Sequence, residues 1–173
     1  MAAHSTGAQF TIRDYRAADF QTLWEIDQRC FPPGIAYSQI ELSSFLRSRN
    51  AIALVAELET ENDERLAAAT PAAGPGATIA GFVVAHSIRH KYGRLLTLDI
   101  VPEARRFGLG MRLMSACEQR LQATGCAAVY LETAVNNEPA LRLYRKLGYE
   151  VLGVLPEYYA SHSLDALEMR KRL

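Results

Sequence analysis

Two side chains in the second half of the chain are suited to moving protons during a reaction. Glu132 ends a short apolar run, and Tyr144 follows it by twelve residues. A carboxylate can remove a proton from an amine, which attacks a carbonyl carbon only when it is neutral. A phenol, whose pKa is about 10, stays protonated at neutral pH and can donate to a leaving group. Without further context, Glu132 also fits a solvated strand end, and Tyr144 also fits a half-buried aromatic on an amphipathic helix.

A glycine turn upstream of these residues is suited to binding an anion. Residues 105–110 read RRFGLG, between the apolar run of residues 95–101 and an amphipathic run that ends near Thr124. Glycines at the start of a helix let backbone N–H groups approach a ligand, and the unpaired N–H groups and the positive dipole end favour an anion. The pattern therefore predicts a diphosphate site. It is neither a Walker loop nor the three-glycine dinucleotide fingerprint.

The elements that must position these residues follow from hydrophobic periodicity and capping signals. Strands are expected at residues 9–13, 51–58, 78–88, 94–101, 127–132, 149–155 and 165–170. Helices are expected from Asp19 to about Arg29, from Ser38 to about Arg49, from the glycine turn to Thr124, and from Asn136 or Asn137 to Gly148. Ser38 and Glu41 have the spacing of a capping box.

Length and composition limit the class of protein and its partners. A chain of 173 residues is most simply one domain. The formal net charge of zero gives no bulk attraction to nucleic acid or to an anionic membrane. The apolar runs are far too short to span a membrane, and the first residues lack a signal-peptide pattern, so we expect a cytoplasmic protein. We expect residues 1–8 to be disordered and residues 59–77 to form an extended surface loop.

Cysteine and histidine spacing gives no metal or disulfide signature. The three cysteines, Cys30, Cys117 and Cys126, include no C-x-x-C pair, which argues against a disulfide framework or a structural zinc site. His86 and His90 are four residues apart, but a strand is expected to end between them. We therefore expect no metal.

From residue 95 to residue 150 the chain resembles the GNAT superfamily of acetyl-coenzyme A-dependent N-acetyltransferases. The shared features, in chain order, are Arg105-x-x-Gly108-x-Gly110, then Leu131-Glu132, then Asn137, then Leu143-Tyr144-x-x-x-Gly148-Tyr149. One such match is weak, but four in order are specific. The resemblance implies an α/β (α+β) fold in one domain, residues 9–173. Its central sheet is mixed, mostly antiparallel and six- to seven-stranded, flanked by about four helices.

Within the superfamily the chain is most similar to the RimI branch, which acetylates protein N-termini, notably that of a ribosomal protein. The matching positions are Phe31-Pro32, Leu131-Glu132, Asn137, Leu143-Tyr144, Tyr158-Tyr159 and Asp165-Ala166. In that branch the residues at the positions of Glu132 and Tyr144 are the proposed base and acid. The resemblance therefore assigns proton removal from the amine to Glu132 and proton donation to the departing thiolate to Tyr144.

The resemblance also implies how acetyl-coenzyme A is held as a cosubstrate. Backbone N–H groups of Leu98, Ile100 and Val101 would bind the pantetheine arm and the thioester carbonyl, which supplies oxyanion stabilisation. The pyrophosphate would be held, mostly by backbone N–H groups, at Arg105, Arg106, Phe107, Gly108, Leu109 and Gly110. Asn137 would contact the pantetheine arm, cap its helix, or do both. Tyr144 would also touch the cofactor, and the acceptor would be bound by Phe31, Pro32, Tyr37, Tyr158 and Tyr159.

Three departures from the RimI pattern leave the acceptor open. Phe107 occupies a slot that is more often polar or basic, residues 33–36 are extra, and Ala134 stands where the branch can have an arginine. Our first interpretation is acetyl transfer, by direct attack, to the α-amine at a protein or peptide N-terminus. The alternatives are transfer to a small amine or a lysine side chain, and a sensor that binds acyl-coenzyme A without turnover. We expect no nucleic-acid or membrane partner, and a monomer or homodimer.

Overall fold

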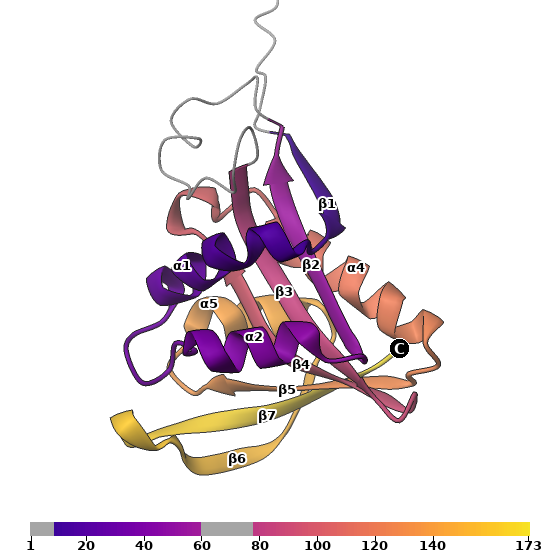
Figure 1. Cartoon of the computed structure of the whole chain (residues 1–173). Helices are drawn as coiled ribbons and strands as arrows, with labels where there is room; N and C mark the ends of the chain where they lie inside the picture. The colour runs from indigo at the N-terminus through magenta and orange to yellow at the C-terminus, as the bar shows by residue number, and fades with distance from the viewer. Residues whose placement is uncertain (1–8, 60–77) are drawn as a thin grey trace, which may run out of the picture.

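Seven strands form one sheet in the order β1-β2-β3-β4-β5-β7-β6 (Figure 1). The computed structural model describes residues 9–59 and 78–173. The strands are β1 (Phe10–Asp14), β2 (Ala51–Leu58), β3 (Thr78–Ile88), β4 (Tyr92–Ile100), β5 (Ala128–Ala134), β6 (Glu150–Tyr159) and β7 (Leu164–Arg172). The predicted disorder of residues 1–8, and all of the predicted loop except Glu59, lie outside the described residues.

Four α-helices and three short 3₁₀ turns accompany the strands in the described residues. The helices are α1 (Phe20–Cys30), α2 (Gln39–Arg47), α4 (Leu109–Ala123) and α5 (Glu138–Lys146), and the turns are η1 (Ala17–Asp19), η2 (Pro102–Ala104) and η3 (Ala160–His162). α1 and α2 pass in front of the sheet, whereas α4 and α5 lie behind it (Figure 1). None of these helices is long and apolar enough to serve as a membrane span.

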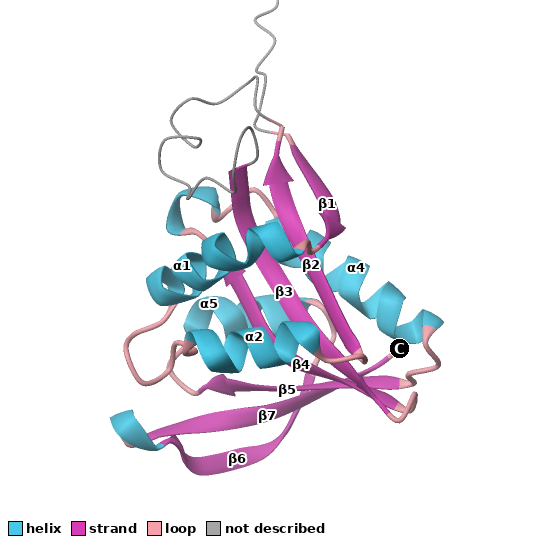
Figure 2. Ribbon diagram, in the orientation of Figure 1, coloured by secondary structure: helices cyan, strands magenta, loops and turns pink. Residues whose placement is uncertain are grey.

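The sheet is antiparallel except between β4 and β5, which are parallel and pair over only two residues. Gly93 pairs with Val129 and Arg94 pairs with Tyr130, and the pairing then stops. All other neighbouring strands are antiparallel over longer stretches. Figure 2 shows β5, β7 and β6 turned away from the direction of β1 to β4. The sheet therefore opens between the C-terminal halves of β4 and β5.

The core occupies both faces of the sheet around β3. Phe82 is fully buried within β3, with Leu23 and Ile26 from α1 on one face and Leu113 and Leu121 from α4 on the other. β3 is buried along nearly its whole length, as expected for a strand covered by helices on both sides. The mixed, mostly antiparallel sheet with four helices confirms the predicted fold class.

The local signals that predicted α2 are confirmed. The Glu41 N–H donates to Ser38 Oγ at 3.2 Å, and the Ser38 N–H donates to the Glu41 carboxylate at 2.9 Å, which is a complete capping box. Asp19 behaves differently from the prediction, because its side chain does not cap α1. Its carboxylate accepts from the Arg16 N–H and forms an ion pair with Arg13.

Two boundaries differ from the sequence-based expectation. β4 begins at Tyr92, before the predicted strand start at Arg94, because the turn is made by Arg89 and His90 in the left-handed region. β6 continues to Tyr159, so Tyr158 and Tyr159 end a strand and do not lie in a loop. Both differences bring side chains to the sheet that periodicity alone assigned to connections.

Candidate active site

Backbone donors of β4 face the opening between β4 and β5. The Val101 N–H donates to the Ala80 carbonyl oxygen at 2.9 Å, on the β3 side. Since the hydrogen-bonding direction alternates along a strand, the N–H groups of Leu98 and Ile100 point away from β3, where β5 no longer pairs. Leu98 and Ile100 thus lie where a ligand arm could add to the sheet. Val101 does not support its predicted donor role, because its N–H is already bonded.

The glycine turn before α4 has the backbone shape of an anion site. Arg106 and Gly108 both have positive φ, of 78° and 74°. The first hydrogen bond of the helix runs from the Arg112 N–H to the Gly108 carbonyl oxygen at 3.1 Å. The N–H groups of Leu109 and Gly110 precede it and have no acceptor within the helix. A Cβ added at Gly108 would meet nothing within 4 Å, so the space beside the turn is open to a ligand.

The second glycine of the turn brings α4 against α5. A Cβ at Gly110 would lie 3.0 Å from Leu143 Cδ2, closer than most such contacts. Leu109, between the two glycines, buries its side chain in the core. The turn is therefore anchored by its side chains while its backbone faces outward. Its N-terminal end lies beside the helix that carries Tyr144.

The larger side chains around the turn have separate partners. Arg105 Nε donates to the Ile100 carbonyl oxygen at 3.3 Å. Phe107 is 43% exposed and packs edge-on against Phe10, with ring centroids 5.7 Å apart. Arg112 donates to the Phe10 carbonyl oxygen at 2.6 Å, so it is directed to β1 and away from the turn. An anion at this turn would therefore meet the backbone N–H groups and the exposed side chain of Arg106.

Tyr144 lies inside the protein with its hydroxyl free. The residue is 6% exposed, and its ring packs against Tyr149 at 5.7 Å. Burial raises the pKa of Tyr144, and the charges of Asp99 and Tyr159 add to the increase. Within residues 9–59 and 78–173, no hydrogen bond to its hydroxyl is formed. Tyr144 is therefore a protonated phenol with an unused donor, as the predicted acid requires.

Glu132 is held by a partner that sequence reasoning missed. Arg94 Nη2 lies 3.0 Å from Glu132 Oε1, and the Glu132 side chain is only 14% exposed. The two residues come from neighbouring strands: Arg94 belongs to the last β4–β5 pair, and Glu132 follows its partner Tyr130 on β5. Knowing that β4 and β5 are parallel neighbours would have predicted this contact, but the sequence does not show which strands pair. The ion pair fixes the orientation of the predicted base.

Asn137 caps α5. Its Oδ1 accepts from the Ala140 N–H at 3.3 Å, and Pro139 lies in the first turn. The capping role left open by the sequence is therefore present. Contact with a cofactor through the amide nitrogen stays a prediction.

The predicted acceptor residues gather at the open side of β4. Tyr37 Oη donates to the Leu96 carbonyl oxygen at 3.1 Å, and burial followed by the charges of Tyr158, Asp99 and Tyr159 raises its pKa. Tyr158 and Tyr159 pack edge-on with centroids 5.0 Å apart. Burial, then Tyr158 and Glu132, raise the pKa of Tyr159 to about 12. Tyr37 therefore lies close to Asp99, and Tyr159 lies close to Glu132.

The segment that links α1 to α2 forms one side of this acceptor region. Phe31 is half-buried and Pro32 is exposed at its start. The extra residues 33–36 make a turn in which Gly34 has a φ of 88°. Ser161 of η3 donates from its hydroxyl to the Gly34 carbonyl oxygen at 3.2 Å. Residues 33–36 thus contact the connection between β6 and β7.

Two buried carboxyl groups below this region also escaped the sequence reasoning. Asp27 of α1 and Asp99 of β4 are both 0% exposed. The signal for Asp99 was present, since an acid inside the apolar run LLTLDIV needs a reason. Asp27 gave no signal, because an acid on an amphipathic helix is normally solvated. Across the described residues, no group of three or more metal-ligating side chains is found.

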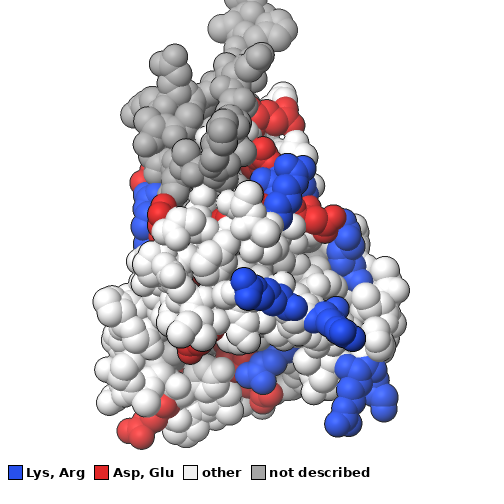
Figure 3. Space-filling view, viewed as in Figure 1, with Lys and Arg blue, Asp and Glu red and all other residues white. Residues whose placement is uncertain are grey.

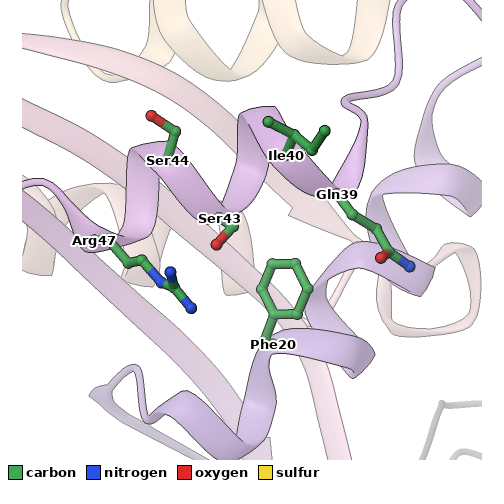
Figure 4. A pocket seen from close by; sticks show the side chains of 6 residues that line it. All are labelled: Phe20, Gln39, Ile40, Ser43, Ser44 and Arg47. Carbon is green, nitrogen blue, oxygen red and sulfur yellow. The ribbon is translucent and has the colours of Figure 1, made fainter.

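A separate hollow lies on the outside of α1 and α2. It has a volume of about 440 Å³ and is lined by Phe20, Gln39, Ile40, Ser43, Ser44 and Arg47. Figure 4 shows Phe20 of α1 and Arg47 of α2 directed toward each other across it. None of the predicted catalytic, cofactor or acceptor residues lines this hollow.

Comparison with known proteins identifies the family. The family model described as "Acetyltransferase (GNAT) family" matches residues 20–149, which is more than half of the chain. The chain belongs to the GNAT acetyltransferase family. An N-alpha-acetyltransferase of Sulfurisphaera tokodaii is 37% identical over 71 residues, covering 40% of this chain and 42% of that protein. The N-alpha-acetyltransferase RimI of Mycobacterium tuberculosis is 33% identical over 75 residues, covering 43% and 46%.

The fold extends the likeness beyond these segments. Arabidopsis thaliana NAA60, crystallised with acetyl-CoA, has a TM-score of 0.77 at 19% identity, covering 95% of this chain and 100% of that one. Four curated relatives are spanned over only 20% to 60% of their own length. Sequence similarity therefore supports family membership, and the likeness to solved structures supports the fold.

The residues of the site fit acetyl-CoA. The open space at Gly108 and the unpaired N–H groups of the turn suit a pyrophosphate. The outward N–H groups of Leu98 and Ile100 suit an extended amide arm. The Tyr144 hydroxyl of α5, which has no partner, is close enough to Asp99 of β4 to feel its charge. Free hydrogen-bond donors thus occur at the turn, along β4 and at Tyr144.

We expect Gly108→Val to weaken acetyl-CoA binding by about tenfold or more, because a branched side chain fills the open space and strains a positive φ. Gly148→Val is the matched control, since Gly148 has a φ of 92° and equally open surroundings but follows α5. Titration calorimetry measures both affinities. Equal affinities in the two variants would mean that the glycine turn is only structural.

Proposed function

We propose that this protein transfers the acetyl group of acetyl-CoA to a primary amine, most directly the α-amine at a protein or peptide N-terminus. The observation that carries the proposal is the opening between β4 and β5. It places free backbone donors of Leu98 and Ile100 between the anion-binding turn and the pair Glu132 and Tyr144. Such an opening suits a linear cofactor whose reactive end must meet an acid and a base.

Residues of β4, β5 and α5 would each carry one part of the reaction. Acetyl-CoA supplies the acetyl group as a thioester. The N–H groups of Leu98 and Ile100 would stabilise negative charge on the carbonyl oxygen. Glu132 would take the proton of the attacking amine, and Tyr144 Oη would donate a proton to the departing sulfur. No group of the protein needs to be acylated.

The acceptor region supports a peptide N-terminus. The three tyrosines Tyr37, Tyr158 and Tyr159 offer flat apolar surface with a polar tip, which suits backbone contacts. Figure 3 shows that Lys and Arg gather toward one side of the face covered by α1 and α2, whereas the side near the α1–α2 connection is largely uncharged. The named relatives are N-alpha-acetyltransferases. A ribosomal protein is one such acceptor to test.

A small amine is the second candidate, and the bridge between Ser161 and Gly34 favours it. That hydrogen bond ties the α1–α2 connection to η3, and such a tie would restrict the space for chain beyond the first acceptor residues. A pocket closed in this way would select a compact amine.

A panel of acceptors tests the acceptor class. The purified protein is titrated with acetyl-CoA and then mixed with N-terminal peptides, acetyl-blocked peptides that contain lysine, and free polyamines, while thiol release is recorded. We expect release only with peptides that carry a free α-amine. Release only with polyamines would transfer the protein to the second candidate. Binding without release from any amine would favour a sensor.

Tyr144→Phe should lower kcat by about 100-fold or more while changing acetyl-CoA affinity only a few-fold, because it removes one hydroxyl proton and little volume. Tyr149→Phe is the matched control. Its hydroxyl donates to Glu118 at 2.9 Å and its ring packs against Tyr144, so its loss affects stability and leaves turnover unchanged. Steady-state kinetics with a fixed acceptor measure the difference. A wild-type kcat in Tyr144→Phe would exclude Tyr144 as the acid.

Glu132→Gln should lower kcat/KM for the amine most strongly at neutral pH. The defect should shrink as the pH rises past about 8, where an α-amine loses its proton without help. Glu168→Gln is the control, because Glu168 is the cross-strand neighbour of Glu132 on β7. The readout is the ratio of each variant to the wild type over pH. A defect of constant size would contradict the base role.

A further inference from the structure

Asp27 and Asp99 each leave one buried oxygen without a partner. Asp27 Oδ1 and Asp99 Oδ2 are the only such side-chain atoms found in the described residues. The other oxygen of each group is bonded: Asp27 Oδ2 accepts from the Tyr37 N–H at 2.7 Å, and Asp99 Oδ1 accepts from Thr97 Oγ1 at 2.5 Å. Two buried acceptors with one unmet oxygen each are costly.

One proton shared by the two carboxyl groups gives both unpartnered oxygens a hydrogen bond. Ionised carboxylates only accept hydrogen bonds, so two of them cannot satisfy each other. A single proton converts one into a donor, and the two carboxyls lie close enough to act on each other by hydrogen bond and by charge. Burial is the largest cause that raises the pKa of each group, and the charge of Asp27 raises that of Asp99 further. Like-charged carboxyls that share a site hold a proton for the same reason.

In the part of the chain that the structure describes, no basic side chain pairs with either carboxyl. The titratable groups around it are Cys30 of α1, Tyr37, Glu41 of α2 and Tyr144 of α5, with Arg105 beside Cys30. Burial raises the pKa of Cys30, Tyr37 and Tyr144, so these groups are neutral. Glu41 is negative, and its charge favours a proton on Asp27. Neither carboxyl forms an ion pair with a basic side chain of the described residues.

Asp27 and Asp99 join the segment between α1 and α2 (residues 31–38) to β4. Asp27 holds the Tyr37 N–H, and Gln28 Nε2 and Trp24 Nε1 hold the Tyr37 carbonyl oxygen at 2.8 and 3.2 Å. Asp99 lies between Leu98 and Ile100, whose N–H groups face the opening. Two further contacts run in parallel, from Tyr37 Oη to the Leu96 carbonyl and from Cys30 Sγ to the Ile100 carbonyl.

We propose that Asp27 and Asp99 share one proton at neutral pH, and that this proton positions residues 31–38 against β4 for acceptor binding. Loss of the proton leaves two buried negative charges in contact. Their repulsion separates α1 from β4 and displaces Tyr37 from the acceptor region. Asp27 and Asp99 are positioning residues, because they act through Tyr37 and do not touch the reacting atoms. The kinetic part of this inference rests on the proposed function.

Asp99→Asn separates positioning from proton transfer. An amide in place of the Asp99 carboxyl donates permanently to Asp27 Oδ1 and still accepts from Thr97. We expect it to be active at neutral pH. The ratio of its kcat/KM for the acceptor to that of the wild type should rise at alkaline pH, with a limiting slope of about tenfold per pH unit for one proton. This ratio cancels the titration of the amine itself, and the change should lie mainly in KM.

Two outcomes would overturn the proposal. A ratio that is constant from about pH 6 to about pH 10 would mean that no shared proton controls binding. An inactive Asp99→Asn that still binds acetyl-CoA would mean that Asp99 transfers a proton itself. Asp27→Asn provides the same test from the other side if Asp99→Asn does not fold, because its amide donates to Asp99 Oδ2 and accepts from the Tyr37 N–H.

A second measurement needs no acceptor, so it remains valid if the proposed function fails. Infrared spectra of protein with ¹³C-labelled aspartate should show a protonated carboxyl band at neutral pH in the wild type. The band should be absent from Asp99→Asn and Asp27→Asn, and its absence from the wild type would overturn the proposal.

The pH dependence of the free energy of unfolding gives a third measurement. A raised pKa in the folded state stabilises at low pH, and that contribution is lost as the pH rises through the folded-state value. The wild type should therefore lose stability at alkaline pH more steeply than Asp99→Asn. Asp19→Asn is the control: burial opposes the shift, but bonds from Arg13 and the Arg16 N–H outweigh it and lower the pKa of Asp19. Its contribution is lost as the pH falls, so its removal should leave the alkaline slope unchanged.

Discussion

β4 and β5 are parallel neighbours that stay paired for two residues, at Gly93 and Arg94, and then diverge. A parallel pair elsewhere in a sheet would use every backbone donor of the strand. Here the second half of β4 keeps its bonds to β3 and leaves the opposite edge unpaired. Unpaired edge groups buried within a protein are unfavourable. A ligand that accepts hydrogen bonds from this edge would fit the opening, and the surrounding elements determine its chemistry.

Those elements divide the opening into two ends with different chemistry. At one end, the left-handed Arg106 and Gly108 turn the backbone N–H groups outward at the positive end of α4. At the other end, Arg94 holds Glu132 and the buried Tyr144 keeps its proton. The acceptor segment reaches this end through contacts between α1 and β4. β4 thus has unpaired N–H groups on one edge and contacts the segment between α1 and α2 through Tyr37.

The sequence was sufficient for whatever is encoded by neighbours along the chain. The Ser38–Glu41 box, the Asn137 cap and the glycine turn each depend on residues a few positions apart, so their elements were predicted close to their true bounds. The contacts that were missed join distant segments. Arg94 meets Glu132 across strands, and Asp27 meets Asp99 across a helix and a strand. For Arg94, Glu132 and Asp27 taken alone, a solvated position was the reasonable expectation, whereas Asp99 stood out inside an apolar run without its partner being evident.

The contact between Gly110 and Leu143 makes the two ends of the opening mechanically dependent. A side chain at Gly110 would lie 3.0 Å from Leu143 Cδ2, so α4 and α5 meet there without clearance. Leu143 precedes Tyr144 on α5, and Gly110 opens α4 at the turn. A side chain at position 110 would therefore displace the end of the Leu143 side chain, one residue before Tyr144.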